Sequence, residues 1–195
     1  MKVVAVVEAH KAIRISSRKG VKLPLVAGAF GKAFLSAVSE GELLELLEET
    51  GLPRFTENSN QEMGLFLQEI RRARQLGYAA DLEEYVGGVA ALAAPVTAGD
   101  RTVGAVWVTG LSDSMQSLKL FTIIRALKTT ARSICTEIES HPAFFAPLRA
   151  ADPFDIRLHK DKQMENDPLS ESLSRGNRAP HKHRRLSLDE RPGHA

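Results

Sequence analysis

The clearest hydrophobic pattern of the chain lies between Gly77 and Gly110. Two apolar runs rich in alanine and valine are joined there by an Ala-Gly-Asp-Arg turn at residues 98–101. Continuous apolar runs around a short glycine-containing turn are typical of a β-hairpin whose strands are covered on both faces. The pattern therefore predicts a hairpin at the centre of a sheet.

The first strand of this hairpin, Val89 to Val96, carries small residues where isoleucine or leucine would fill more volume. These residues are Ala90, Ala91, Ala93 and Ala94. Small side chains leave room either for another element packed close to the sheet or for a ligand. We interpret the strand as the wall of a small cavity, with close packing as the alternative.

Residues 26–38 repeat apolar side chains at helical spacing and contain Gly28 and Gly31 near the first turn. Glycine lets the backbone come close to whatever lies above it, and the free N–H groups of a helix start favour an anion. The alternative is a helix packed flat on the sheet.

Two Ser-x-x-Glu sequences, at Ser39 and Ser59, are capping boxes that predict helix starts. The first predicts a helix over residues 40–50, and the second predicts a longer helix through Leu76. The arginines of the second helix are expected to form a solvated outer face. They are Arg71, Arg72 and Arg74.

Two β-branched runs, Val3 to Glu8 and Ala12 to Ser17, predict another hairpin at the start of the chain. At the other end of the predicted domain, Asp113 or Ser114 is a candidate cap for a final helix that ends near Glu139 and covers the sheet.

The 195 residues are enough for one domain with its own core and an appendage. Residues 1–139 contain 16 Lys and Arg against 16 Asp and Glu, so the net charge of +2 falls in residues 140–195. A neutral body argues against a nucleic-acid surface there. Because the composition from residue 141 onward is polar without period, we predict a folded domain over 1–139 and a disordered polar tail over 140–195.

The predicted domain contains few residues of the types that bind metals or form disulfides. Of the six histidines only His10 precedes residue 141, which excludes a multi-histidine metal site from the predicted domain. The single cysteine, Cys135, excludes an internal disulfide and fits a reducing cytoplasm. The apolar start from Val3 to Val7 is too short for a membrane helix or a signal-peptide core, so we expect a cytoplasmic protein with no membrane partner.

Several motifs occur in an order and spacing that resemble a known family. They are RISSRKGVKLPLVAGAFGKAFLSAV, TGLPRFTENS, QEIRRARQLGYAADLEE, GGVAALAAPV and VGAVWVTG. Together, over about residues 2–139, they are similar to the effector-binding C-terminal domain of the IclR family of bacterial transcriptional regulators.

The resemblance implies a GAF-like α/β (α+β) fold, with an antiparallel sheet flanked by helices. It implies a small-molecule effector, often an organic acid, and assembly as a homodimer or homotetramer, and it gives no reason to expect a cofactor, a metal or catalysis. It also implies that DNA is bound by an N-terminal winged helix-turn-helix domain, which would precede Met1. The sequence leaves open whether the chain is a fragment, begins late or is a stand-alone sensor.

Carried over position by position, the family's effector pocket falls on six residues. They are Ala29, Phe30, Asp81, Ala91, Trp107 and Thr109. Amides at the helix start are expected to hold a carboxylate, Thr109 to donate a hydrogen bond, and Asp81 to accept one from a hydroxyl or ammonium. Glu83 and Glu84 are expected to hydrogen-bond the surrounding turns rather than the ligand.

Trp107 departs from the family, in which this position commonly carries a small hydroxyl residue. If Trp107 lies opposite Ala91, its indole either fills the pocket or shapes it for a flat aromatic acid stacked on the ring.

Three functions are compatible with these observations. The one we predict is effector sensing by an IclR-type domain. The second is an enzyme on the same scaffold, with Cys135 or Asp81 as the reactive group. The third is a ligand-free oligomerisation or interaction module derived from such a regulator.

Overall fold

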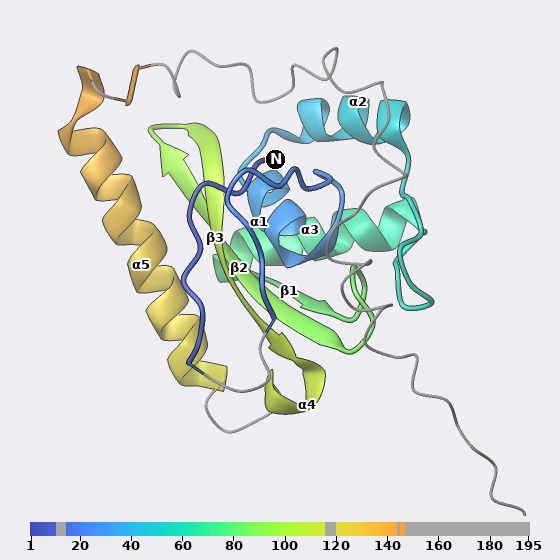
Figure 1. The fold of residues 1–195 in the computed structure, drawn as a ribbon. Coiled ribbons are helices and arrows are strands. Elements are labelled where there is room, and N and C mark those ends of the chain that lie inside the picture. The colour runs from blue at the N-terminus through green and yellow to red at the C-terminus, as the bar shows by residue number, and fades with distance from the viewer. Residues whose placement is uncertain (11–14, 116–119, 144, 147–195) are drawn as a thin grey trace, which may run out of the picture.

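A three-stranded antiparallel sheet lies at the centre of the computed structural model, which describes residues 1–10, 15–115, 120–143 and 145–146. The strands lie in the order β1 (Ala79–Leu82), β2 (Val89–Ala98), β3 (Arg101–Leu111). The helices are α1 (Gly28–Ser36), α2 (Glu40–Thr50), α3 (Met63–Leu76), α4 (Ser112–Met115) and α5 (Leu120–Ser140). Helix α5 covers one face of the sheet and α1 covers the other, with α3 beside α1 (Figure 1). The expected sheet flanked by helices is confirmed.

The predicted central hairpin is confirmed. Strands β2 and β3 pair from Val89↔Leu111 to Ala98↔Arg101, and Gly99 has the positive φ of 67° that the tight turn requires. The short strand β1, which the sequence pattern did not predict, pairs with β2 on the other side. Its four residues alternate between buried and exposed, a pattern too short to separate from a loop.

Alternate residues of β2 enter two different cores. Ala91 and Ala93 pack with α1 residues such as Ala29 and Phe30. The α5 side of the strand is buried against the amphipathic face of that helix by Leu92, Ala94, Val96 and Ala98. The continuous apolar run is therefore explained by a strand that is covered on both faces.

One of the two predicted capping boxes is formed. At α2 the Ser39 hydroxyl accepts from the Glu42 amide at 3.3 Å, and the Glu42 carboxylate accepts from the Ser39 amide at 3.3 Å. The second box is wrong, because α3 begins at Met63 without a side-chain cap. The Ser59 hydroxyl instead bonds other loops, donating to the Glu84 carbonyl at 2.7 Å. The Ser59 hydroxyl therefore bonds groups in loops instead of capping the helix.

The predicted caps of the final helix are also wrong. Asp113 and Ser114 lie inside the short helix α4, and α5 begins later, at Leu120. The end of α5 at Ser140 agrees with the expected end near Glu139. From residue 147 onward, the predicted tail over 140–195 lies outside the described residues.

The predicted N-terminal hairpin differs most from the structure. Among the described residues before α1, the only β pairing is a single bridge between Lys2 and Lys22. Val4 and Val7 of the first predicted strand are 75% and 98% exposed, and four residues of the second, 11–14, lie outside the described part. Valine favours strands because it packs on a half-buried pleated surface, and these valines have no such surface beneath them.

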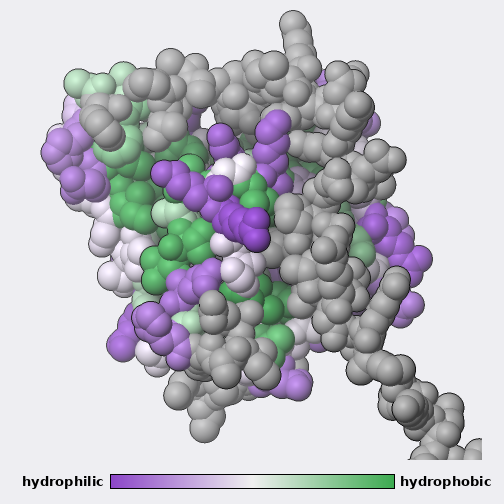
Figure 2. Space-filling view, viewed as in Figure 1, coloured by the Kyte–Doolittle hydropathy of each residue, from purple (hydrophilic) through white to green (hydrophobic). Residues whose placement is uncertain are grey.

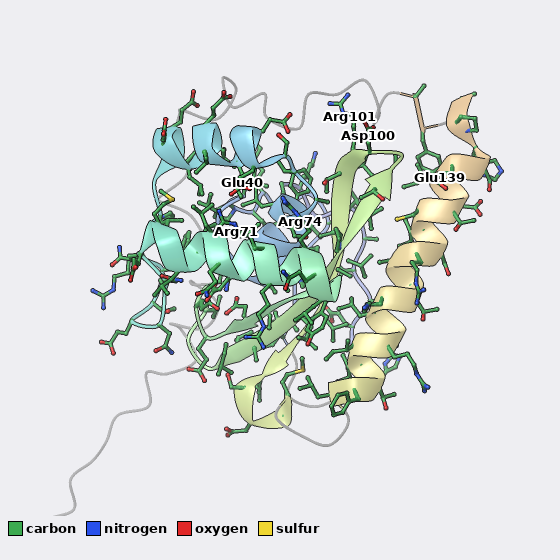
Figure 3. The ribbon with its side chains drawn as sticks, turned by 180° about the vertical axis from the view of Figure 1, so that it is seen from behind. Glu40, Arg71, Arg74, Asp100, Arg101 and Glu139 are labelled. Carbon is green, nitrogen blue, oxygen red and sulfur yellow. The ribbon has the colours of Figure 1, made fainter. Side chains whose placement is uncertain are left out.

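The three arginines of α3, Arg71, Arg72 and Arg74, are all exposed, so the predicted outer face is confirmed. Two of them also join helices. Arg71 forms an ion pair with Glu40 of α2, and both side chains stay about half exposed. Arg74 donates to the carbonyls of Ser36 and Val38 at 2.7 and 2.6 Å, at the end of α1. Figure 3 shows Glu40, Arg71 and Arg74 together between α2 and α3.

In the described part of the chain, no helix is both long and apolar enough to cross a bilayer.

Candidate functional site

A small cavity lies on the α1 side of the sheet. Its walls come from the start of α1, the loop between β1 and β2, the α1-facing side of β2 and β3, and the chain segment that precedes α1. Its volume is about 50 Å³, enough for roughly four water-sized groups. The described residues that line it are Ile15, Ser17, Leu23, Phe30, Asp81, Tyr85, Val86, Val89, Ala91, Trp107 and Thr109.

Five of the six residues expected at the pocket line this cavity. They are Phe30, Asp81, Ala91, Trp107 and Thr109. Ala29 does not line it; its side chain is fully buried and its amide bonds the Asp81 carboxylate. The α1 side of the strand pair therefore places residues that are far apart in the sequence around one space.

Trp107 narrows the cavity without filling it. The register places Trp107 opposite Ala93, and Thr109 opposite Ala91, so the condition considered above, Trp107 opposite Ala91, is not met. The indole lies against Phe30, with ring centroids 5.7 Å apart and ring planes at 50°. Phe30 in turn meets Tyr85 edge to face at 5.5 Å. These rings form a continuous aromatic wall.

Asp81 joins the start of α1 to the loop after β1. Its Oδ1 accepts from the Glu84 amide at 2.7 Å, and the amides of Tyr85 and Ala29 also donate to the carboxylate. Burial raises the pKa of the Asp81 carboxyl above its ordinary value, while these hydrogen bonds and the charge of Lys32 oppose the rise. The helix-start amide of Ala29, expected to be free for a ligand, is therefore already bonded.

The two glycines of α1 allow this close approach. Gly28 has a φ of +55°, and a Cβ atom there would lie 2.8 Å from Asp81 Oδ2. A Cβ atom at Gly31 would lie 2.3 Å from the Leu25 carbonyl oxygen. The expectation that these glycines bring the backbone close to its neighbours is confirmed, and the neighbours are protein groups.

Beside the cavity, Lys32 of α1 forms a buried ion cluster that the sequence analysis missed. Its side chain is 4% exposed, and its Nζ lies 2.6 Å from Glu84 and 2.7 Å from Glu69 of α3. Nζ also donates to the Ala80 carbonyl at 3.3 Å. The available signal was one lysine between apolar residues on a short helix, because a lysine in a buried position needs a charged partner.

The carboxylates of Glu83 and Glu84 both bond other groups of the protein. Glu84 pairs with Lys32, and burial raises the pKa of its carboxyl against the opposing effect of that lysine. Glu83 accepts from the Gly88 amide at 3.1 Å and has a φ of 63°, unusual for a residue other than glycine. The expectation that these carboxylates bond the surrounding turns is confirmed for Glu83, whereas the Glu84 carboxylate bonds a lysine of α1.

Two hydroxyls complete the polar part of the cavity wall. Thr109 Oγ1 donates to the Ala90 carbonyl at 3.3 Å, so its proton is engaged and its lone pairs remain for a ligand. Ser17 Oγ is buried and has no hydrogen-bond partner among the described residues. A buried hydroxyl without a partner costs free energy, and a ligand in the cavity would remove that cost.

The residues considered for catalysis do not meet in this cavity. Cys135 lies on α5, across the sheet from it, and its sulfur accepts from the Thr97 amide at 3.2 Å. Asp81 has no histidine among the described lining residues. The described part of the chain also contains no group of three His, Cys, Asp or Glu side chains that could hold a metal ion.

Comparison with known proteins gives one family. Residues 1–136 match the family described as "Bacterial transcriptional regulator IclR C-terminal". The HTH-type transcriptional repressor AllR of Escherichia coli K12 is 31% identical over 138 residues, which is 69% of this chain and 51% of AllR. The chain thus spans about half the length of the curated relatives it matches.

Solved structures agree with this result. The Thermotoga maritima IclR structure is 29% identical, with a TM-score of 0.64, and the match covers 68% of this chain and 54% of that one. The inducer-binding domain of an Acinetobacter PobR double mutant, in complex with 3-hydroxybenzoic acid, is 28% identical with a TM-score of 0.56; the match covers 60% of this chain and 69% of that one. The chain belongs to the IclR family of bacterial transcriptional regulators, not to an enzyme family, and its residues 1–136 correspond to the C-terminal effector-binding domain of that family.

Proposed function

We propose that this domain senses a small-molecule effector that binds in the cavity between α1 and the β2–β3 hairpin. The observation that carries the proposal is the partly polar cavity itself, lined by five of the six expected residues and containing the unbonded Ser17 hydroxyl. A buried hydroxyl without a partner beside empty space favours a ligand site over close packing.

Organic acids are the first effector class to test. The sequence resemblance implies them, and the similar PobR domain was solved with 3-hydroxybenzoic acid. The size of the cavity favours compact acids, since about 50 Å³ holds roughly four water-sized groups. The indole of Trp107 in the cavity wall also offers a flat surface on which a planar ligand can stack.

Effector binding would act through the loop that closes the cavity. This loop, residues 83–88, joins β1 to β2. Its Tyr85 lines the cavity, as does Asp81 in β1 just before it, and its Glu84 binds Lys32 of α1. The Glu84 carbonyl also accepts from Ser59, just before α3. A ligand that favours one position of this loop therefore shifts the populations of the α1–α3 arrangement. In a bacterial regulator this shift would reach DNA through a winged helix-turn-helix domain in the cytoplasm.

Trp107 provides the readout for this proposal because it is the only tryptophan and lies in the cavity wall. The full chain is titrated with a panel of aliphatic and aromatic carboxylic acids and their uncharged derivatives, following Trp107 fluorescence and thermal melting. At a ligand concentration of 100 Kd, binding stabilises the native state by about 2.7 kcal/mol and raises Tm. No response to any member of the panel would remove the main support for sensing.

Two matched variants locate the binding site. Ala91 faces the cavity and Ala94, three residues later on the same strand, faces α5. Ala91→Val fills part of the cavity, so it should abolish the ligand response, whereas Ala94→Val should preserve it. Equal responses in both variants would place the ligand elsewhere.

We also propose that the domain forms a homodimer or homotetramer. Large apolar side chains are exposed at Val4 (75%), Val7 (98%) and Phe121 (84%), and Figure 2 shows apolar surface on the face that carries α5 and the N-terminal segment. Light scattering should give the mass of an oligomer, and Phe121→Ser should lower it if α5 takes part. An oligomer with no ligand response would instead support the ligand-free interaction module.

A further inference from the structure

The polar wall of the cavity is built mainly from hydrogen-bond acceptors. Asp81 contributes a carboxylate, and three backbone amides occupy three of its roughly four acceptor positions. Thr109 donates its proton to the Ala90 carbonyl and thus presents lone pairs. Among the described lining residues no side chain is cationic. A ligand that brings hydrogen-bond donors matches this wall.

Lys32, which lies beside the cavity, does not change this excess of hydrogen-bond acceptors. Lys32 Nζ donates to Glu84 at 2.6 Å and to the Ala80 carbonyl at 3.3 Å, and it forms an ion pair with Glu69 at 2.7 Å. With Asp81 included, the group holds three carboxyls and one ammonium. Glu69 and Glu84 engage the positive charge of Lys32, which therefore cannot serve as a counter-ion for a ligand carboxylate in the cavity.

The start of α1 does not supply the missing positive potential either. The Ala29 amide already donates to the Asp81 carboxylate, which lies at the helix N-terminus where a ligand anion would otherwise bind. A carboxylate ligand would have to displace Asp81 or lie against it in a buried site.

We infer that the cavity selects an uncharged hydrogen-bond donor, of the primary-amide or hydroxy-amide class, over the carboxylate of the same shape. The inference rests on the proposed sensing function and narrows its ligand class. An amide NH₂ would donate to Asp81 and Thr109, and the unbonded Ser17 hydroxyl would donate to the amide carbonyl oxygen. All three groups belong to the described cavity wall.

Acid and amide pairs of equal size test this selection directly. The full 195-residue chain is titrated near neutral pH and at constant ionic strength with glycolate and glycolamide, lactate and lactamide, and benzoate and benzamide, using Trp107 fluorescence. In the pair that binds most tightly, the amide should bind at least tenfold more tightly than its acid. An acid that binds as tightly as its amide, or more tightly, overturns the inference and leaves the sensing function standing. If no member of any pair binds, both proposals fall together.

Two variants assign the selectivity to residues. Asp81→Asn should reduce the preference for the amide at least tenfold, whereas Asp100→Asn, at the exposed hairpin turn labelled in Figure 3, should leave it unchanged. Because Asp81 also joins α1 to its loop, Ser17→Ala serves as a second variant. Removing the unbonded Ser17 hydroxyl should leave Tm unchanged or raise it, and should weaken amide binding severalfold. An unchanged amide affinity in Ser17→Ala would contradict the assigned contact.

Discussion

The two faces of the sheet are built from alternate residues of one strand, yet they differ in packing and in charge. On the α5 side, Leu92, Ala94 and Val96 pack against Leu127, Ala131 and Ile138 in a purely apolar core. On the α1 side, Ala91 lies beside a cavity, and Asp81 and Lys32 are buried nearby. One face holds a helix to the sheet through apolar contacts, and the other contains empty space and polar groups.

This difference shows that the element packed opposite a small residue decides whether that residue lies in a filled core or borders a cavity. Ala91 and Ala94 look alike in the sequence, and both are buried. The apolar residues of α5 cover Ala94, whereas the side chains around Ala91 leave empty space. Substitutions on the two faces should therefore differ in their effect on stability.

Lys32→Met should cause the largest loss of stability. It leaves Glu69 and Glu84 without their buried counter-charge, and breaking such a pair typically costs about 3–5 kcal/mol in the free energy of unfolding. Urea denaturation measures the loss. Lys128→Met is the control, because Lys128 of α5 also donates to a carbonyl, that of Leu76, but is exposed. A loss no larger than that of the control would mean that the ion cluster is not a structural element.

Leu127→Ala should rank second. Leu127 is 2% exposed in the apolar core under α5, and a buried leucine truncated to alanine costs about 2–5 kcal/mol. Leu23→Ala on the cavity side should cost less, because part of that side chain borders empty space and makes fewer contacts. Equal losses in the two variants, measured by urea denaturation, would contradict the claim that only one face is hollow.

The pair Ala94→Val and Ala91→Val should separate the faces by a smaller amount. Extra methyl groups in a filled core cost about 1–3 kcal/mol, which is expected for Ala94. At Ala91 the cavity accepts them, so the change in the free energy of unfolding should stay within about 0.5 kcal/mol. A Tm of Ala91→Val as low as that of Ala94→Val would show that the cavity wall does not accommodate the added side chain.

The pH dependence of Asp81 should give the smallest effect. Burial raises its native pKa above the ordinary value of 3.8, so the native state binds this proton more readily than the unfolded chain. The ionised group therefore costs stability at neutral pH, and this cost disappears as pH falls through the raised pKa. Relative to Asp81→Asn, the wild type should gain stability in urea denaturation as the pH falls from neutral towards the ordinary value of 3.8. A relative loss of stability over that range would mean that the pKa of Asp81 is lowered, not raised, in the native state.

Much of the fold followed from local patterns. The β2–β3 hairpin, the capping box at Ser39 and the end of α5 were predicted because each depends on neighbouring residues or on a long period. The capping box at Ser59 and the N-terminal hairpin failed for the opposite reason. A distant carbonyl, that of Glu84, accepts from the Ser59 hydroxyl, and Val4 and Val7 are exposed instead of packing on a buried surface.

The candidate site shows the same division. Family motifs placed Phe30, Asp81 and Thr109, all of which line the cavity. Ser17 and the partners of Lys32 were missed, because a single serine or lysine gives no sign of what faces it after folding.

The sequence alone determined the family, the hairpin, the main helices and the side chains available to a ligand, because these depend on residue type, order and short-range spacing. Only the tertiary structure decided how those side chains are used. In that structure Trp107 lies opposite Ala93, and the amide at the start of α1 bonds Asp81. Lys32 lies between Glu69 and Glu84. Register and ion pairing depend on residues that are distant in the chain, so they are settled only when the sheet and helices pack together.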